Sequence, residues 1–194
     1  MSGKLVSAGV LLAGLVAGAA SGWYTLQHGM VQGETYSGWR GSKVTGSVDA
    51  DPWTRARVAV SGLLALNKSQ AIYFSRNTDD SGARLREDCR YRVSGGALPA
   101  RWWSITVYAA DNYLPLNDDD ALSFDQTEAQ PAGKVEWTGI LSPKRPEGEP
   151  WASTNKAGDY DITLRLYQPT PRAQQDYGAI PMPKVTKLDC GGAA

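Results

Sequence analysis

The stretch RWWSITVYA, residues 101–109, has the clearest two-residue alternation in this chain of 194 residues. Because successive side chains of a β-strand point to opposite faces, it predicts a strand with one apolar and one mixed face. The apolar face would carry Trp103, Ile105 and Val107. The mixed face would carry Trp102, Ser104, Thr106 and Tyr108. Such a strand packs on a core with its first face and leaves the second for solvent or a partner.

Segments on both sides repeat the alternation, and turn signals such as NTDDSG (77–82) separate them. The predicted strands are 71–75, 89–94, 101–109, 134–141, 160–168 and 185–190. Within 134–141 the residues expected on one side are Val135, Trp137 and Leu141. Within 160–168 the core would receive Ile162, Leu164 and Leu166, and the outer face Asp161, Thr163, Arg165 and Tyr167. The pattern predicts a mainly β protein, an antiparallel β-sandwich of jelly-roll character.

One flanking α-helix is predicted from Pro52 to about Asn67, because Asp51 can cap it and apolar residues follow at helical spacing. Its apolar stripe is expected to pack on a sheet. Residues 25–50 are rich in glycine and lack a sustained apolar period, which is typical of a linker. The predicted organisation is therefore a membrane anchor or signal peptide (1–24), a linker (25–50) and a β-sandwich domain (51–194).

The N-terminal apolar run from Leu5 to Gly22 has about the minimum length of a membrane-spanning helix. A cleaved signal peptide is one interpretation, because Ala17-Gly18-Ala19 fits the small-x-small pattern before a cleavage site. A retained transmembrane helix is the favoured one. It is supported by a stripe of small residues that lets another helix approach in the membrane, namely Gly14, Gly18 and Gly22.

The flanks of this run predict its orientation. Lys4 precedes it, whereas residues 23–39 contain no Lys or Arg, so the positive-inside rule keeps the N-terminus in the cytoplasm. Trp23 and Tyr24 follow at once, as expected for rings at the headgroup level. The predicted location is the bacterial inner membrane, with a single pass and the main domain in the periplasm.

Composition and cysteine content narrow the class of protein. The 20 Lys and Arg residues balance 20 Asp and Glu residues, and no basic stripe is interleaved with aromatic residues, so nucleic acid is not an expected partner. Cys89 and Cys190 both follow the apolar run, and in an oxidising compartment we expect them to form a disulfide. Two unrelated thiols are the alternative.

Three longer segments resemble a known family. DADPWTRARVAVSGLLALNKSQAIYF, CRYRVSGGALPARWWSITVYAADNYLPLN and GDYDITLRLYQP, followed by a terminal cysteine, are similar to the bacterial domain of unknown function twelve-fourteen, in its compact, membrane-anchored version. The resemblance covers most of residues 49–190 and implies a jelly-roll β-sandwich in the envelope. In longer relatives this domain follows the uncharacterised domain twelve-fifty-four, so a separate protein of that type is the expected companion. The resemblance implies no reaction.

Motifs for catalysis are missing from the sequence. The only histidine, His28, lies beside the membrane, and no nucleophile elbow, phosphate-binding loop or HExxH motif occurs. We therefore predict no catalytic residues, no cofactor and no metal site. Two hypotheses stay open: carboxylates such as Asp111, Glu136 and Asp161 for hydrolysis, and calcium at the acidic loop 111–125.

The mixed faces of 101–109 and 160–168 are the candidate site. If the two strands are neighbours, their outward residues form one surface of flat rings and hydrogen-bonding groups, typical of protein interfaces and of polar-ligand sites. Its residues are Trp102, Ser104, Thr106, Tyr108, Asp161, Thr163, Arg165 and Tyr167. The ordinary solvent face of a strand is the alternative.

Two functions compete at this point. The favoured one is a non-catalytic, single-pass envelope protein whose β-sandwich docks a companion subunit and helps to bind a small ligand. The alternative is a periplasmic hydrolase or lyase that uses carboxylates on a polar or carbohydrate substrate. The lack of a usable histidine and of any catalytic motif favours the first.

Overall fold

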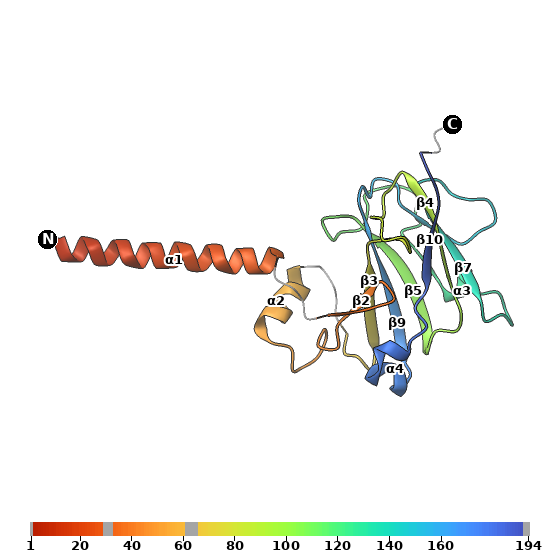
Figure 1. The fold of residues 1–194 in the computed structure, drawn as a ribbon, viewed down its shortest axis with the longest axis horizontal. Coiled ribbons are helices and arrows are strands. Elements are labelled where there is room, and N and C mark those ends of the chain that lie inside the picture. Colours follow the sequence, from red (N-terminus) through yellow and green to blue (C-terminus); the bar gives the residue numbers. More distant parts are fainter. Residues whose placement is uncertain (1, 29–32, 61–65, 192–194) are drawn as a thin grey trace.

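The computed structural model describes residues 2–28, 33–60 and 66–191, and consists of one long helix and a β domain (Figure 1). The helices are α1 (Ser2–His28), α2 (Pro52–Val60), α3 (Gln126–Ala129), α4 (Pro171–Gln175) and a 3-10 turn, Tyr177–Ala179. The strands are β1 (Glu34–Tyr36), β2 (Trp39–Gly41), β3 (Ala71–Arg76), β4 (Cys89–Gly95), β5 (Ala100–Tyr108), β6 (Ser123–Asp125), β7 (Trp137–Ser142), β8 (Trp151–Ser153), β9 (Asp161–Pro169) and β10 (Lys184–Cys190).

The strands form two sheets, which confirms the mainly β prediction. A six-stranded sheet has the order β1-β2-β3-β9-β5-β6, and a four-stranded sheet has the order β10-β4-β7-β8. The prediction of antiparallel pairing is wrong for one pair, because β7 and β8 are parallel. Their register begins at Ile140 and Trp151. The chain therefore steps back only a short way along β7, and residues 143–150 suffice for the return.

The core lies between the two sheets and confirms the predicted alternation. The inward residues of β5 and β9 are each at most 1% exposed, namely Trp103, Ile105, Val107, Ile162, Leu164 and Leu166. Across the layers, the rings of Trp103 and Trp137 have centroids 4.1 Å apart. Val135 does not join this core: it is 58% exposed, because β7 begins only at Trp137, after a turn in which the Lys134 amide bonds the Pro131 carbonyl.

Residues 34–41, within the segment expected to be a linker, form β1 and β2 and extend the six-stranded sheet. Trp39 is fully buried and its Nε1 donates to the carbonyl of Pro183 over 2.8 Å. Gly41 lies under Phe74, whose ring would come within 2.4 Å of a Cβ at this position. Glycine here permits close packing, although in the sequence it signals a loop.

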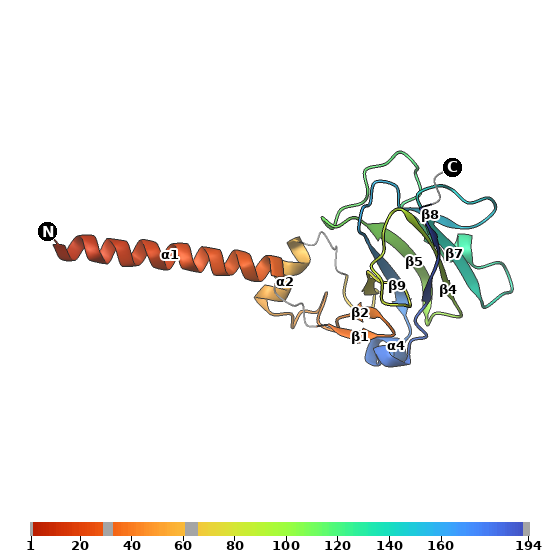
Figure 2. The same cartoon turned by 45° about the horizontal axis from the view of Figure 1, so that its top comes forward.

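Helix α2 begins as predicted, with Asp51 Oδ1 accepting hydrogen bonds from the amides of Trp53 and Thr54. It is described only as far as Val60, and residues 61–65 lie outside the described part of the chain. Asn67, predicted as the helix end, instead starts a turn in which its Oδ1 accepts from the amides of Ser69 and Gln70. The apolar stripe expected to pack on a sheet continues into residues 61–65, so that prediction falls outside the described part of the chain. The main neighbour of Pro52–Val60 is the C-terminal end of α1 (Figures 1 and 2).

Helix α1 contains one stretch, Val6–Thr25, that is long and apolar enough to cross a membrane, with a mean hydropathy of 1.6 and 0% of it buried. Nothing lies within 4 Å of a Cβ built on Gly14, Gly18 or Gly22. The glycine stripe is therefore open in the single chain, and its role in helix packing stays a prediction.

Cys89 and Cys190 form a disulfide with an S–S distance of 2.05 Å, which confirms that prediction. The two residues are direct cross-strand partners in β4 and β10. The bond holds the C-terminal strand on the edge of the four-stranded sheet and joins residues 101 positions apart.

Replacing both cysteines, Cys89→Ala with Cys190→Ala, is expected to destabilise the domain by up to about 4.7 kcal/mol, because the unfolded chain regains the entropy of a loop of about 100 residues. Thermal unfolding followed by circular dichroism, with and without reductant, measures the effect. Reductant should lower the Tm of the native chain and leave that of the double variant unchanged. Equal Tm values for the oxidised native chain and the double variant would contradict the prediction.

Candidate functional site

Strands β5 and β9 are neighbours, as the site hypothesis required, and their outward residues face each other in pairs. The register pairs Trp102 with Tyr167, Ser104 with Arg165, Thr106 with Thr163, and Tyr108 with Asp161. We call these eight residues the polar–aromatic face. It lies on the outer side of the six-stranded sheet, opposite the core residues of the same strands.

The centre of the polar–aromatic face is covered by its own larger side chains. Ser104, Thr106 and Thr163 are buried at 7%, 9% and 6% exposure, although they point away from the core. The Arg165 guanidinium donates to Thr106 Oγ1 over 2.7 Å and to the hydroxyl of Tyr108. It also lies 5.4 Å from the centroid of the Tyr108 ring. Arg165 is thereby fixed flat on the sheet, which lowers the entropy cost of using it in recognition.

The aromatic end of the face is formed by Trp102 and Tyr167, whose ring centroids are 5.1 Å apart. Trp102 Nε1 donates to Thr127 Oγ1 over 3.3 Å, which ties the ring to α3. Beside it lies an open hollow of about 450 Å³, lined by Arg101, Trp102, Gln126, Thr127, Gln130 and residues 131–134. The Oε1 atom of Gln126 is buried and has no hydrogen-bond partner within the described part of the chain. This end offers a ring and two cationic side chains, Arg101 and Lys134.

The other end of the face is polar and ion-paired. Asp161, opposite Tyr108, accepts a hydrogen bond from Arg84 Nη1 over 2.7 Å. Arg84 comes from the segment after β3, so the sequence alternation gave no sign of this contact. The side chains of Arg84 and Asp161 are 34% and 39% exposed, so the pair is open to solvent or to a partner.

The acidic loop 111–125 uses its polar groups to hold the chain together. Asp119 Oδ2 accepts from Ser153 Oγ over 2.6 Å and from Asn155 Nδ2 over 3.3 Å, and Asn117 Nδ2 donates to the Asn155 carbonyl. Over the described ranges, no group of three or more acidic, cysteine or histidine side chains is placed to hold a metal ion. The hypothesis of a calcium site therefore gains no support.

The family of the chain follows from comparison with family models. Residues 70–171, just over half of the sequence, match the family described as protein of unknown function (DUF1214). The chain belongs to this family. The DUF1214 match runs from the start of β3 to the start of α4 and so contains the whole polar–aromatic face. It excludes β1, β2, β10 and Cys190.

A solved structure shares the fold. The VPA0106 protein from Vibrio parahaemolyticus matches with a TM-score of 0.58 at 21% identity, over 73% of this chain and 36% of that one. An uncharacterised protein from Burkholderia cenocepacia matches with a TM-score of 0.45 at 14% identity, over 61% of this chain and 30% of that one. The chain thus spans about a third of the length of these proteins. No curated protein matches it.

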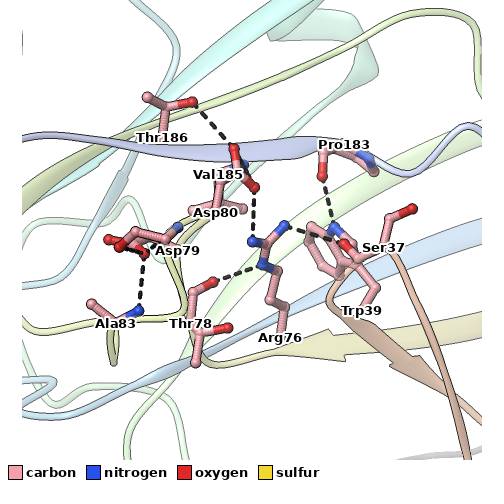
Figure 3. A network of polar contacts seen from close by, with 11 residues as sticks. Ser37, Trp39, Arg76, Thr78, Asp79, Asp80, Ala83, Pro183, Val185 and Thr186 are labelled. Atoms are coloured by element: carbon pink, nitrogen blue, oxygen red, sulfur yellow. Dashed lines mark hydrogen bonds and ion pairs between the residues drawn. The ribbon is translucent and has the colours of Figure 1, made fainter.

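Two elements outside the DUF1214 match, the β1–β2 hairpin and β10, are attached through a buried arginine that the sequence did not reveal (Figure 3). The side chain of Arg76, at the end of β3, is 4% exposed. Its Nε donates to the Thr78 carbonyl over 2.6 Å, and its Nη2 to Asp80 Oδ1 over 2.8 Å. Nη1 reaches the Ser37 carbonyl, between β1 and β2, over 3.5 Å. We call this cluster the Arg76 clasp.

Asp80 links the Arg76 clasp to β10. Both of its carboxylate oxygens accept from the Val185 amide over 3.1 Å, and Oδ2 also accepts from Thr186 over 3.3 Å. The neighbouring Asp79 shapes the turn: burial raises the pKa of its carboxyl, but hydrogen bonds from Ser81 and Ala83 outweigh burial, so the pKa is lowered. Its contribution to stability is therefore present above the ordinary carboxyl pKa and is lost as the pH falls through the lowered value.

Replacing the buried guanidinium, Arg76→Met, is expected to cost roughly 3 kcal/mol of unfolding free energy, because several acceptors lose their buried partner. Urea titration in mild detergent, followed by tryptophan fluorescence, measures it. The matched control is Arg86→Met, whose ion pair with Asp88 is 59% and 45% exposed and is expected to contribute less than about 1 kcal/mol. Equal losses in the two variants would show that burial of Arg76 is not what matters.

Proposed function

We propose that this DUF1214 protein is a single-pass envelope protein whose periplasmic domain docks a companion protein through the polar–aromatic face. In this proposal α1 stays in the inner membrane with its N-terminus in the cytoplasm, and the two sheets form a jelly-roll sandwich. The observation that carries the proposal is the pairing of β5 with β9, which gathers Trp102, Tyr108, Arg165 and Tyr167 on one outward surface.

The chemistry of this surface suits a protein partner. Interface cores are enriched in Trp, Tyr and Arg, and their strongest contacts come from rigid side chains that lose little entropy on binding. Trp102 and Tyr167 are held against each other, and Arg165 is held by Thr106 and Tyr108. All four of the large side chains are only half-buried in the single chain, so a partner would remove further area from water.

A separate protein of the domain twelve-fifty-four type is the proposed companion. The solved Vibrio protein carries this fold within a longer chain, of which the match covers only 36%. A second chain would supply here what the rest of a longer chain supplies there. The hollow beside Trp102 would then lie at the edge of the interface, where Arg101 and Lys134 can bind a small polar ligand.

The anchor is tested by the mass and location of the mature protein. We expect an intact mass that includes residues 5–22, and retention in membranes after carbonate washing, because α1 buries its apolar side chains in lipid. A soluble periplasmic species that begins near Ala20 would contradict the anchor and identify the segment as a signal peptide.

Docking is tested by photocrosslinking with p-benzoylphenylalanine in cells that co-express a twelve-fifty-four-type companion. Position 167, at the aromatic end of the face, should crosslink to the companion. Position 92 is the matched control, because Arg92 is exposed on β4 of the other sheet. Equal crosslinking from both positions, or none from position 167, would contradict docking through this face.

The same complex gives an energetic check. Trp102→Ala with Tyr167→Ala should weaken companion binding at least about 30-fold, since loss of one aromatic hot spot costs about 2 kcal/mol or more and the losses of two touching rings do not simply add. Tyr113→Ala, which removes a 69% exposed ring from a loop outside the face, should leave the affinity unchanged.

A further inference from the structure

We infer that α2 is a membrane-interface helix, with Trp53 inserted among the lipid headgroups. The inference rests on the proposed anchor, because it takes the position of the bilayer from α1. It adds a second contact between the protein and the lipid surface, made by the segment that precedes the DUF1214 match.

The first step is the depth of α1 in the bilayer. Its apolar stretch ends at Thr25, directly after Trp23 and Tyr24, which are 67% and 66% exposed. Exposed aromatic rings at the end of an apolar helix are typical of the boundary between hydrocarbon and headgroups. Helix α1 continues only to His28, and three further residues add roughly 4.5 Å. That rise stays within the headgroup layer, which is roughly 5–7 Å thick on each side.

The second step is the position of α2. It packs against α1, and Figures 1 and 2 both show it beside the last turns of that helix, at the end next to the β domain. Because those turns lie in the headgroup layer, a helix in contact with them lies in or on that layer. Helix α2 is therefore placed at the membrane surface by its neighbour.

The third step is the surface that α2 presents there. Trp53 is 53% exposed and Val48, just before the helix, is 86% exposed. Arg55 donates to the carbonyls of Ala50 and Val48 over 2.9 and 2.6 Å, so the turn and the helix form one hydrogen-bonded unit. Thr54, next to Trp53, is buried at 6% exposure. A rigid unit with an exposed tryptophan suits the membrane–water interface, because the apolar ring can contact acyl chains while its Nε1 donates to polar headgroups.

Lipid is favoured over a protein occupant because contact with α1 brings α2 to the bilayer without any other chain. The charges of the segment balance, with Asp49 and Asp51 against Arg55 and Arg57, so insertion would depend on the ring rather than on anionic lipid. As a consequence, the contact of α2 with lipid, next to α1, would limit the tilt of the β domain relative to the membrane. In both views the six-stranded sheet lies nearer to α1 than the other sheet does.

The test uses the full chain, labelled with 5-fluorotryptophan and placed at one copy per nanodisc of phosphatidylethanolamine and phosphatidylglycerol. The seven tryptophans give fluorine resonances that single Trp→Phe variants assign. Lipid with a nitroxide on its headgroup should remove most of the intensity of Trp23 and Trp53. Trp137 and Trp151, which are 2% and 8% exposed in the β domain, should keep theirs.

Loss at Trp23 without loss at Trp53 would overturn the inference and leave the anchor standing. No loss at either tryptophan would contradict the anchor itself, so the two failures are distinguishable. A water-soluble gadolinium chelate gives the second reading. Strong broadening of Trp53 in single copies, relieved only when a second copy or the companion is added, would assign the ring to a protein contact and overturn the lipid interface.

Discussion

The burial of one positive charge organises the periphery of this domain. A guanidinium removed from water must be met by acceptors, or it costs several kcal/mol. Arg76 is 4% exposed, and its acceptors come from the β1–β2 hairpin, from the turn after β3 and from Asp80, whose carboxylate also binds β10. The hairpin and β10 lie on different sheets: the hairpin strands pair over three residues or fewer, whereas β10 pairs with β4 along its whole length. The Arg76 clasp therefore fixes the outer strands of the two sheets relative to each other.

The strands that carry the core were predictable, because two-residue alternation is a local signal and burial follows from it. Trp103, Ile105 and Val107 face the core for this reason. Strands β1 and β2 were not predictable, since each has three residues and exists through long-range pairing. Trp39 is held by Pro183, and Gly41 is shaped by Phe74. Arg76 continues the inward series of Ile72 and Phe74, and strict alternation would have placed a charge in the core had the strand been extended by one residue.

The polar–aromatic face was also predictable only in part: its residues were, but their contacts were not. Its eight residues could be listed from the sequence because β5 and β9 share one pattern, and that pattern survives any pairing in which the two strands are neighbours. The partners of these residues depend on register, which the sequence does not encode locally. In the observed register Arg165 lies opposite Ser104, and its guanidinium donates to the next outward residue of β5, Thr106. Arg84 reaches Asp161 from another part of the chain, and the hollow at Trp102 needs α3 and the loop that follows it.

The boundary of the DUF1214 match separates the polar–aromatic face from the elements around it. Inside it lies the face, on strands whose alternation already specifies a two-sided sheet. Outside it lie α1 and α2, together with the β1–β2 hairpin and β10. The hairpin and β10 are attached through the Arg76 clasp, and β10 also through the Cys89–Cys190 disulfide. The clasp and the disulfide join the edges of the two sheets to the strands within the match. In the proposed function, those strands would make the contacts with the companion, and the hairpin and β10 would stiffen the sheets that carry the face.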